Sequence, residues 1–193
     1  MMEKRVLFFK VGRQLSGLDL VRTQGIENLS HFTSIMNISP NVKGLMALRG
    51  DILPVYSLAS KFGAEQQRFG NHTQVIIGKL RDGMLVAFVI DEVKEIIEID
   101  MQAFSAPPQL IRSDKTDYIE SVVTNKGVLT VMLSLDKLVE PQEIEVIKKL
   151  VDDAKKKEQE KKEEALRREL EERRKKEQEE KERKEQEEKK KEK

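Results

Sequence analysis

The sequence predicts a mainly β domain, built as a sandwich or as small barrels, followed by a long and highly charged C-terminal segment. Short apolar segments alternate with turn residues through about the first 140 positions, which is the spacing typical of sandwiches and barrels. Residues 152–193 then hold 18 Lys or Arg and 17 Asp or Glu. An apolar core can therefore form only from the residues before them.

The predicted strands follow one another closely along the first part of the chain. Turn tripeptides at 81–83 (Arg-Asp-Gly) and 125–127 (Asn-Lys-Gly) indicate two hairpins. Pro54 falls inside a strand, which favours an edge strand or a bulge. One helical turn is expected over 58–62, ended by Gly63. The segments expected as strands are 5–11, 17–21, 45–48, 52–56, 73–80, 84–90, 93–99, 118–124 and 128–133.

A C-terminal helix is expected to begin at Pro141, a residue that suits the first helical turn. Its apolar residues recur at three- and four-residue spacing, which predicts one stripe packed on the β domain. Those residues are Ile144, Ile147, Leu150 and Val151.

Beyond Val151 the apolar stripe ends, and no heptad pattern for a coiled coil can be drawn. Eleven Glu residues precede a Lys or Arg by four positions between 152 and 193, and this segment contains no Gly or Pro. Each such pair stabilises a helix by about 0.2–0.5 kcal/mol. The same composition is also typical of disorder. Residues 152–193 are therefore expected to form a charged single helix or a disordered tail.

Composition excludes several classes of function. The net charge is +1, without the clustered basic residues of a nucleic-acid groove, and there is no Cys for a disulfide or a thiolate site. No apolar run reaches the length of a signal peptide or a membrane span. His31 and His72 stand apart from each other. These observations predict a cytoplasmic, non-enzymatic protein without a cofactor, a metal site or membrane insertion.

Four stretches resemble the CheW-like family of chemotaxis coupling proteins. Residues 42–58 (VKGLMALRGDILPVYSL) are similar to the family signature K-G-x-x-N-L-R-G-x-x-x-P-V-x-D-L. Residues 17–26 (GLDLVRTQGI) resemble G-I-D-I-x-x-V-Q-E-I, with Gly25 where the family commonly has Glu. Residues 86–93 resemble G-I-V-V-D-x-V, and 135–138 resemble D-x-x-K-L-L. The similarity covers about residues 4–140.

The resemblance implies two five-stranded β-barrels packed together over residues 1–140, followed by the docked helix start at 141–151 and the charged tail at 152–193. It also implies a chemotaxis adaptor that couples chemoreceptors to the histidine kinase CheA. The partners would be the regulatory domain of CheA and the cytoplasmic tip of a methyl-accepting chemoreceptor. The expected receptor groove and its motif comprise Gly44, Leu48, Arg49, Gly50, Gln74, Val75 and Ile96. The expected kinase face comprises Thr23, Gln24, Gly25, Ile26 and Glu27.

Two alternatives remain open at this point. Within the adaptor class, the protein could be a scaffold that binds receptors without coupling the kinase, because Gly25 removes a charge from the kinase face and Ser121 replaces a glycine that the family usually has in the last hairpin. In a different class, small barrels also occur as oligonucleotide-binding folds, which stack bases on exposed aromatic residues over a basic groove. Aromatic residues make up 5% of this chain, which argues against a nucleic-acid partner.

Overall fold

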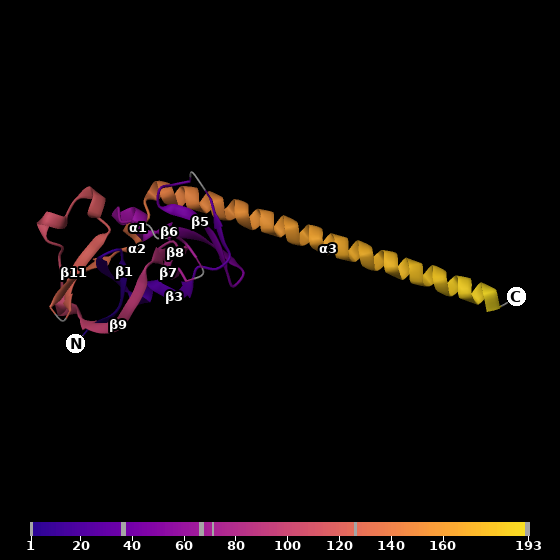
Figure 1. Ribbon diagram of the computed structural model, residues 1–193, viewed down its shortest axis with the longest axis horizontal. Helices are drawn as coiled ribbons and strands as arrows, with labels where there is room; N and C mark the ends of the chain where they lie inside the picture. Colours follow the sequence, from indigo (N-terminus) through magenta and orange to yellow (C-terminus); the bar gives the residue numbers. More distant parts are fainter. Residues whose placement is uncertain (1, 36–37, 66–67, 71, 126, 192–193) are drawn as a thin grey trace. The chain divides into compact units, whose positions relative to one another are not determined.

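A computed structural model describes residues 2–35, 38–65, 68–70, 72–125 and 127–191. The chain divides into two compact units, Met1–Val151 and Asp152–Lys193. The strands belong to the first unit (Figure 1). They are β1 (Glu3–Val11), β2 (Gln14–Asp19), β3 (Thr23–Asn28), β4 (Phe32–Ser34), β5 (Val42–Leu48), β6 (Asp51–Ser57), β7 (Gln74–Lys79), β8 (Leu85–Ile90), β9 (Glu92–Asp100), β10 (Phe104–Ser105), β11 (Ile119–Asn125) and β12 (Val128–Leu133).

The helical elements are short except for the last one. The α-helices are α1 (Leu58–Phe62), α2 (Leu135–Leu138) and α3 (Pro141–Lys191), and the 3-10 turns are η1 (Leu20–Arg22), η2 (Met101–Ala103), η3 (Gln109–Ile111) and η4 (Asp114–Thr116). None of the helices in the described ranges combines the length and apolarity needed to cross a membrane.

The strands form two six-stranded sheets. Sheet A has the order β10-β11-β12-β2-β1-β9, and sheet B has the order β3-β7-β8-β6-β5-β4. Sheet B is thus built from one continuous stretch of chain, whereas sheet A combines strands from before and after that stretch. The predicted mainly β fold with two packed β units is confirmed. Each sheet has six strands instead of five because the short strands β4 and β10 extend it.

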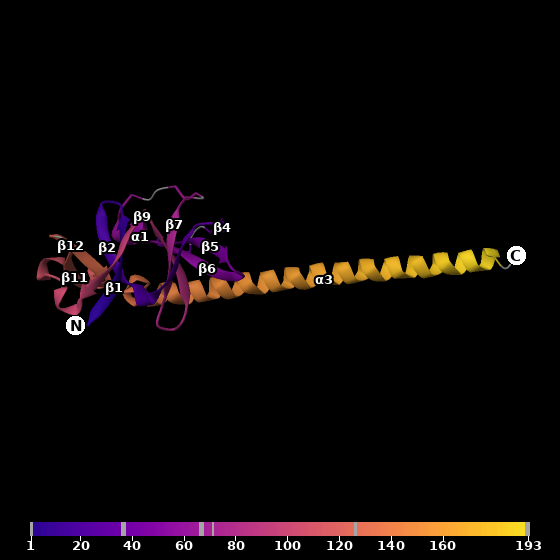
Figure 2. The same cartoon turned by 90° about the horizontal axis from the view of Figure 1, so that it is seen from below.

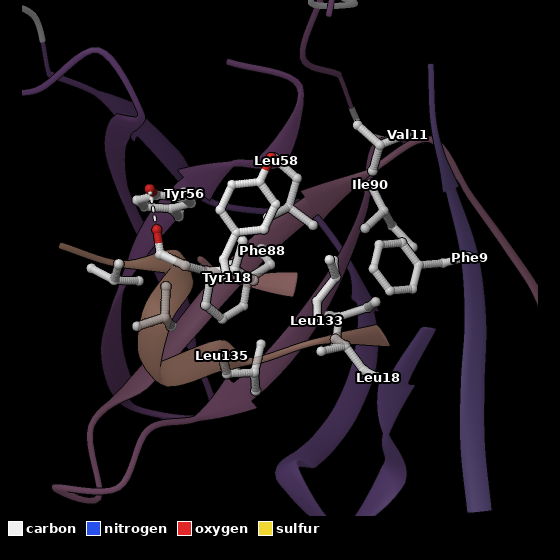
Figure 3. Packing of buried hydrophobic residues seen from close by; sticks show 14 of the residues in the cluster. Phe9, Val11, Leu18, Tyr56, Leu58, Phe88, Ile90, Tyr118, Leu133 and Leu135 are labelled. Atoms are coloured by element: carbon white, nitrogen blue, oxygen red, sulfur yellow. Dashed lines mark hydrogen bonds between the residues drawn. The ribbon is translucent and has the colours of Figure 1, made fainter. Parts of the chain in front are cut away.

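Three apolar clusters explain why several strands are apolar on both faces. One cluster lies between the sheets and the other two belong to one sheet each. In β1, Leu7 and Phe9 pack into the shared cluster while Val6 and Phe8 pack into that of sheet A. Strand β8 divides its side chains in the same way between the shared cluster and that of sheet B. Figure 3 shows the shared cluster, with side chains from both sheets meeting around Phe88.

Sheet B curls around its own cluster. The Arg49 side chain, at the turn between β5 and β6, forms an ion pair with Glu27 on β3. In the strand order β3 and β6 are three places apart, about 14 Å in a flat sheet. The ion pair brings these two parts of the sheet together, as the barrel-like interpretation requires.

Two local predictions need correction. Strand β6 is not an edge strand, since it pairs with β5 on one side and β8 on the other, although its pairing with β5 does contain a register shift between Val42 and Gly44. Pro54 is tolerated because the parallel ladder with β8 begins at Val55, so no ladder bond to β8 is lost at position 54. The predicted strand 17–21 ends at Asp19, whose side chain caps the turn η1. The hairpin at 125–127 joins β11 to β12, although Lys126 lies outside the described residues.

The start of α3 packs on the β domain through the predicted apolar residues. Ile147 is fully buried in the shared cluster. Ile144 and Val151 are partly buried against the same cluster, and Leu150 is half-buried. This part of the helix therefore completes the core that the two sheets share.

A buried carboxylate, missed in the sequence, fastens the same helix start. Oε1 of Glu143 accepts hydrogen bonds from Ser39 Oγ (2.5 Å) and Asn41 Nδ2 (3.1 Å). Oε2 accepts from the backbone N–H of Glu140 (3.1 Å) and lies 3.0 Å from the Tyr56 hydroxyl. That hydroxyl also lies 2.8 Å from the carbonyl oxygen of Leu138. Burial, together with the neighbouring Glu143 carboxylate, raises the pKa of Tyr56 far above its ordinary value, so the hydroxyl remains a donor.

The second unit continues the same helix without a break to Lys191 (Figure 2). Three of the expected i, i+4 ion pairs are formed in its described side chains: Glu158–Lys162 at 2.6 Å, Glu164–Arg168 at 2.6 Å and Glu169–Arg173 at 3.3 Å. The side chains described between 161 and 177 are all exposed. The helical form of the tail is therefore the one that the structure has.

Candidate functional site

The β5–β6 turn holds two consecutive residues with positive φ. Arg49 has φ 53° and Gly50 has φ 91°, the combination that a type I′ hairpin turn requires. Gly tolerates this conformation, but for a residue with a Cβ it costs about 1–2 kcal/mol. Asn would be better suited than Arg to the first of these positions. A strained residue that the turn does not need points to a role for the side chain itself.

The Arg49 guanidinium is held at the surface by one carboxylate. Its Nη2 lies 2.7 Å from Oε1 of Glu27, and the Arg49 side chain is 80% exposed while that of Glu27 is 29% exposed. Four of the five N–H donors of the guanidinium are therefore free of this bond and can meet a partner. The structure thus joins a residue expected in the receptor motif to a residue expected on the kinase face.

The edge strand β3 carries the five residues expected on the kinase face. Thr23, Gly25 and Glu27 are partly buried, whereas Gln24 and Ile26 are exposed. The pairing with β7 shifts between Thr23 and Gly25, so Gln24 forms a bulge at the edge of the sheet. A side-chain hydroxyl, that of Thr23, is buried there without a hydrogen-bond partner among the described residues.

Three of the predicted residues point towards the side of their strand that faces the other sheet. Ile26 pairs with Ile76, and Ile96 pairs with Leu7. Both partner residues belong to the cluster between the sheets, and paired residues share a face. Gln74 lies two positions before Ile76 and so shares this face.

The same side of the molecule is tied together across the two sheets. Oε1 of Gln74, on β7, accepts a hydrogen bond of 3.1 Å from the backbone N–H of Val93, on β9. Ile26 is 37% exposed and Ile96 is 52% exposed, on edge strands of sheets B and A respectively. We therefore group Ile26 with Gln74 and Ile96 as candidates for the receptor groove, although the sequence had put Ile26 on the kinase face.

Three other predicted residues contribute to the packing of sheet B. Val75 is fully buried in the cluster of sheet B, so it has no surface to offer a partner and does not line a groove. Leu48 is half-buried against the same cluster. Gly44 has φ 151°, and a Cβ built on it would lie 2.0 Å from the carbonyl oxygen of Thr33. It is thus a glycine because β4 passes close to it.

A second cluster that the sequence did not reveal lies where η1, α2 and the β7–β8 turn meet. Both oxygens of Asp136 accept from the Arg22 guanidinium, at 2.8 and 2.9 Å. The same carboxylate binds Arg81 through its Nε at 2.9 Å and through its backbone N–H at 2.7 Å. Asp136 therefore fixes the chain where it passes from β2 to β3. A pairing over more than one hundred positions leaves no local signal in a sequence.

A cavity of about 260 Å³ lies elsewhere, between Val11, Ala59, His72, Val89 and Asp91 among others. Its lining includes none of the residues predicted for the receptor groove or the kinase face. The exposed candidate residues thus lie on edge strands and at the signature turn, apart from this cavity.

Comparison with known proteins agrees with this architecture. Residues 5–143 match the family model of the CheW-like domain. Two relatives are each called chemotaxis protein CheW. The one from Klebsiella aerogenes is 25% identical over 142 residues, which cover 73% of this chain and 84% of the relative. The one from Treponema pallidum is 23% identical over 150 residues, which cover 76% of this chain and 88% of the relative.

A solved structure is similar as well. The scaffolding protein TtCheW from Thermoanaerobacter tengcongensis superposes with a TM-score of 0.65 and 25% identity, covering 72% of this chain and 94% of its own. The sheets, the signature turn and the family match agree over the same residues. This chain belongs to the CheW-like family of chemotaxis adaptor proteins.

Proposed function

We propose that this protein is a non-enzymatic adaptor that couples a methyl-accepting chemoreceptor to the regulatory domain of CheA. The observation that carries the proposal is the pair of isoleucines Ile26 and Ile96, which remain exposed on two edge strands and point to the side where the sheets meet. An apolar contact of this kind suits the apolar face of a partner helix. Both proposed partners act in the cytoplasm, so we propose that compartment for the adaptor.

The two binding functions can be tested separately. Titrations of the purified chain against a receptor-tip fragment and against the kinase regulatory domain should each show saturable binding. The substitution Ile96→Glu should weaken receptor binding about tenfold or more, since a charge replaces a desolvated apolar contact. Val128→Glu is the matched control, because Val128 is also 52% exposed and lies on β12 of the same sheet.

The outcomes separate the candidates. Binding of both fragments supports the coupling role, and equal effects of the two substitutions contradict the proposed groove. Binding of the receptor without the kinase would instead establish the scaffold without kinase coupling. Binding to neither fragment would overturn the proposal.

For the tail we propose the role of a charged spacer. Residues 152–193 would extend about 60 Å as a continuous helix, and the ion pairs formed along it support such a helix. We propose residues 1–140 as the adaptor domain and 141–151 as its docked helical end. Removal of 152–193 should then leave the affinity for both fragments unchanged, since the candidate site lies outside it.

A further inference from the structure

Strand β3 has a glycine at a position where the CheW-like family commonly has a glutamate. Position 25 is Gly, where the pattern G-I-D-I-x-x-V-Q-E-I has Glu. The geometry shows what occupies that place instead. A Cβ built on Gly25 would have one neighbour within 4 Å, and this neighbour is Oε1 of Glu27, at 3.9 Å. The Glu27 carboxylate thus lies in van der Waals contact with the place where a side chain at residue 25 would begin.

The two positions are interchangeable for a structural reason. Residues 25 and 27 lie on the same face of an extended strand, and the bulge before Gly25 restores the register with Ile77 and Val75 for both. The φ of Gly25 is not in the left-handed region, and its Cβ would have space. A glutamate could therefore stand at position 25 without strain.

The recipient of this carboxylate is the strained arginine of the signature turn. The backbone of Arg49 is strained at φ 53°. Its Nη2 is held 2.7 Å from Oε1 of Glu27. Without an ion pair, an 80% exposed arginine side chain would sample many rotamers. A guanidinium already held in one orientation loses less entropy when it binds carboxylates or carbonyl oxygens of a partner.

We infer that Glu27 is a positioning residue for Arg49, and that it supplies from position 27 the carboxylate that Gly25 lacks. This inference rests on the proposed adaptor function. It assigns Arg49 the contact with the partner and Glu27 the orientation of that contact. It also predicts that the carboxylate can be moved back by two positions without loss.

The test compares three variants of the full chain with the wild type. Glu27→Gln removes the charge, Gly25→Glu combined with Glu27→Gln moves it to position 25, and Arg49→Asn removes the guanidinium while suiting the turn. Asp117→Asn is the control, since it breaks another exposed ion pair, Asp117–Lys137 at 2.8 Å. Affinities for the receptor-tip fragment and the kinase regulatory domain are measured by titration calorimetry at fixed salt.

The expected pattern is a loss for Glu27→Gln and its recovery in the double variant. Glu27→Gln should weaken binding of at least one fragment about fivefold, the size that an exposed ion pair can contribute. Arg49→Asn should weaken the same binding at least as much, and the control should bind as the wild type does. A double variant as weak as Glu27→Gln, or a Glu27→Gln variant with wild-type affinity for both fragments, would overturn the inference.

A second measurement needs no partner. Nitrogen-15 relaxation of the Arg49 side-chain Nε–H should report an ordered guanidinium in the wild type and the double variant, and a mobile one in Glu27→Gln. Equal order in all three would overturn the positioning role. If the wild type binds neither fragment, the adaptor proposal fails, while this measurement still decides whether Glu27 holds Arg49.

Discussion

The buried carboxylate of Glu143 should contribute more to the stability of the β domain than any exposed glutamate of the same helix. It is 7% exposed and has four donors directed at its two oxygens. In Glu143→Gln an amide N–H₂ replaces one oxygen, so one N–H donor, either Asn41 Nδ2 or the backbone N–H of Glu140, faces another donor whichever way the amide turns, while the hydroxyls of Ser39 and Tyr56 can rotate to accept. One lost bond to a charged acceptor, together with the weaker bonds that a neutral amide makes to the other donors, amounts to about 2–3 kcal/mol.

The assay must report on the β domain without the charged tail, whose helix melts gradually. Both tyrosines, Tyr56 and Tyr118, lie before residue 152, so their near-ultraviolet circular dichroism follows the β domain alone. For a domain of this size, 2–3 kcal/mol corresponds to a fall in Tm of about 4–12 °C. The control is Glu145→Gln, which makes the same charge change at an exposed position of the same helix. If the two variants melt within about 1 °C of each other, the network does not fasten the helix.

Three further predictions concern the C-terminal third of the chain. In calorimetry, a chain ending at Val139 should have a lower melting temperature than one ending at Val151, because the shared core loses Ile147. Equal melting temperatures would contradict the packing of the apolar stripe on the β domain. The hydrogen bond from Lys148 lowers the pKa of Asp82 below 3.8, so the stability from this pair is present above that pH and lost as pH falls through the lowered pKa. In Lys148→Met an NMR titration should give a higher pKa for Asp82 than in the wild type, and an unchanged pKa would refute the pairing. A peptide of residues 152–193 should be helical by circular dichroism at low salt and weaken gradually in about 1 M salt, where the Debye length is about 3 Å; a random-coil spectrum at low salt would exclude the single helix.

The β elements were predictable because their signals are local. Turn residues such as the Arg-Asp-Gly at 81–83 separate apolar runs, and α1 follows a clear apolar turn ended by Gly63, which has φ 67°. Pro54 suggested an edge strand because proline has no backbone N–H to donate. The ladder with β8 begins only at Val55, so the structure needs no donor at position 54 on that side. That offset depends on where two strands distant in sequence come into register, which a single strand does not reveal.

The sequence proposed residues for the candidate site but could not reveal how they pair. The signature marked Arg49, yet Glu27 was assigned to a different face because the two residues are 22 positions apart. Val75 was misplaced because β7 is apolar on both faces, and the sequence does not show which side meets the second sheet. Glu143 had a local signal, a Glu at the third helical position after a Pro at the first, which is half of a capping box.

The strands of sheet B lie, along the sequence, between the first two and the last four strands of sheet A. This order affects how the chain folds during synthesis. Every strand of sheet B is synthesised before β9, so that sheet can begin to assemble while the face that will meet sheet A is still uncovered. Sheet A has to wait, since β1 and β2 are made first but pair with β9 and β12 from the other end of the domain. Closing so long a loop is slow. During this interval the apolar residues of β1 and β8 that meet in the finished core still lack their partners from the other sheet, and Ile147, on the last helix, is the last of the fully buried residues of that core to be synthesised.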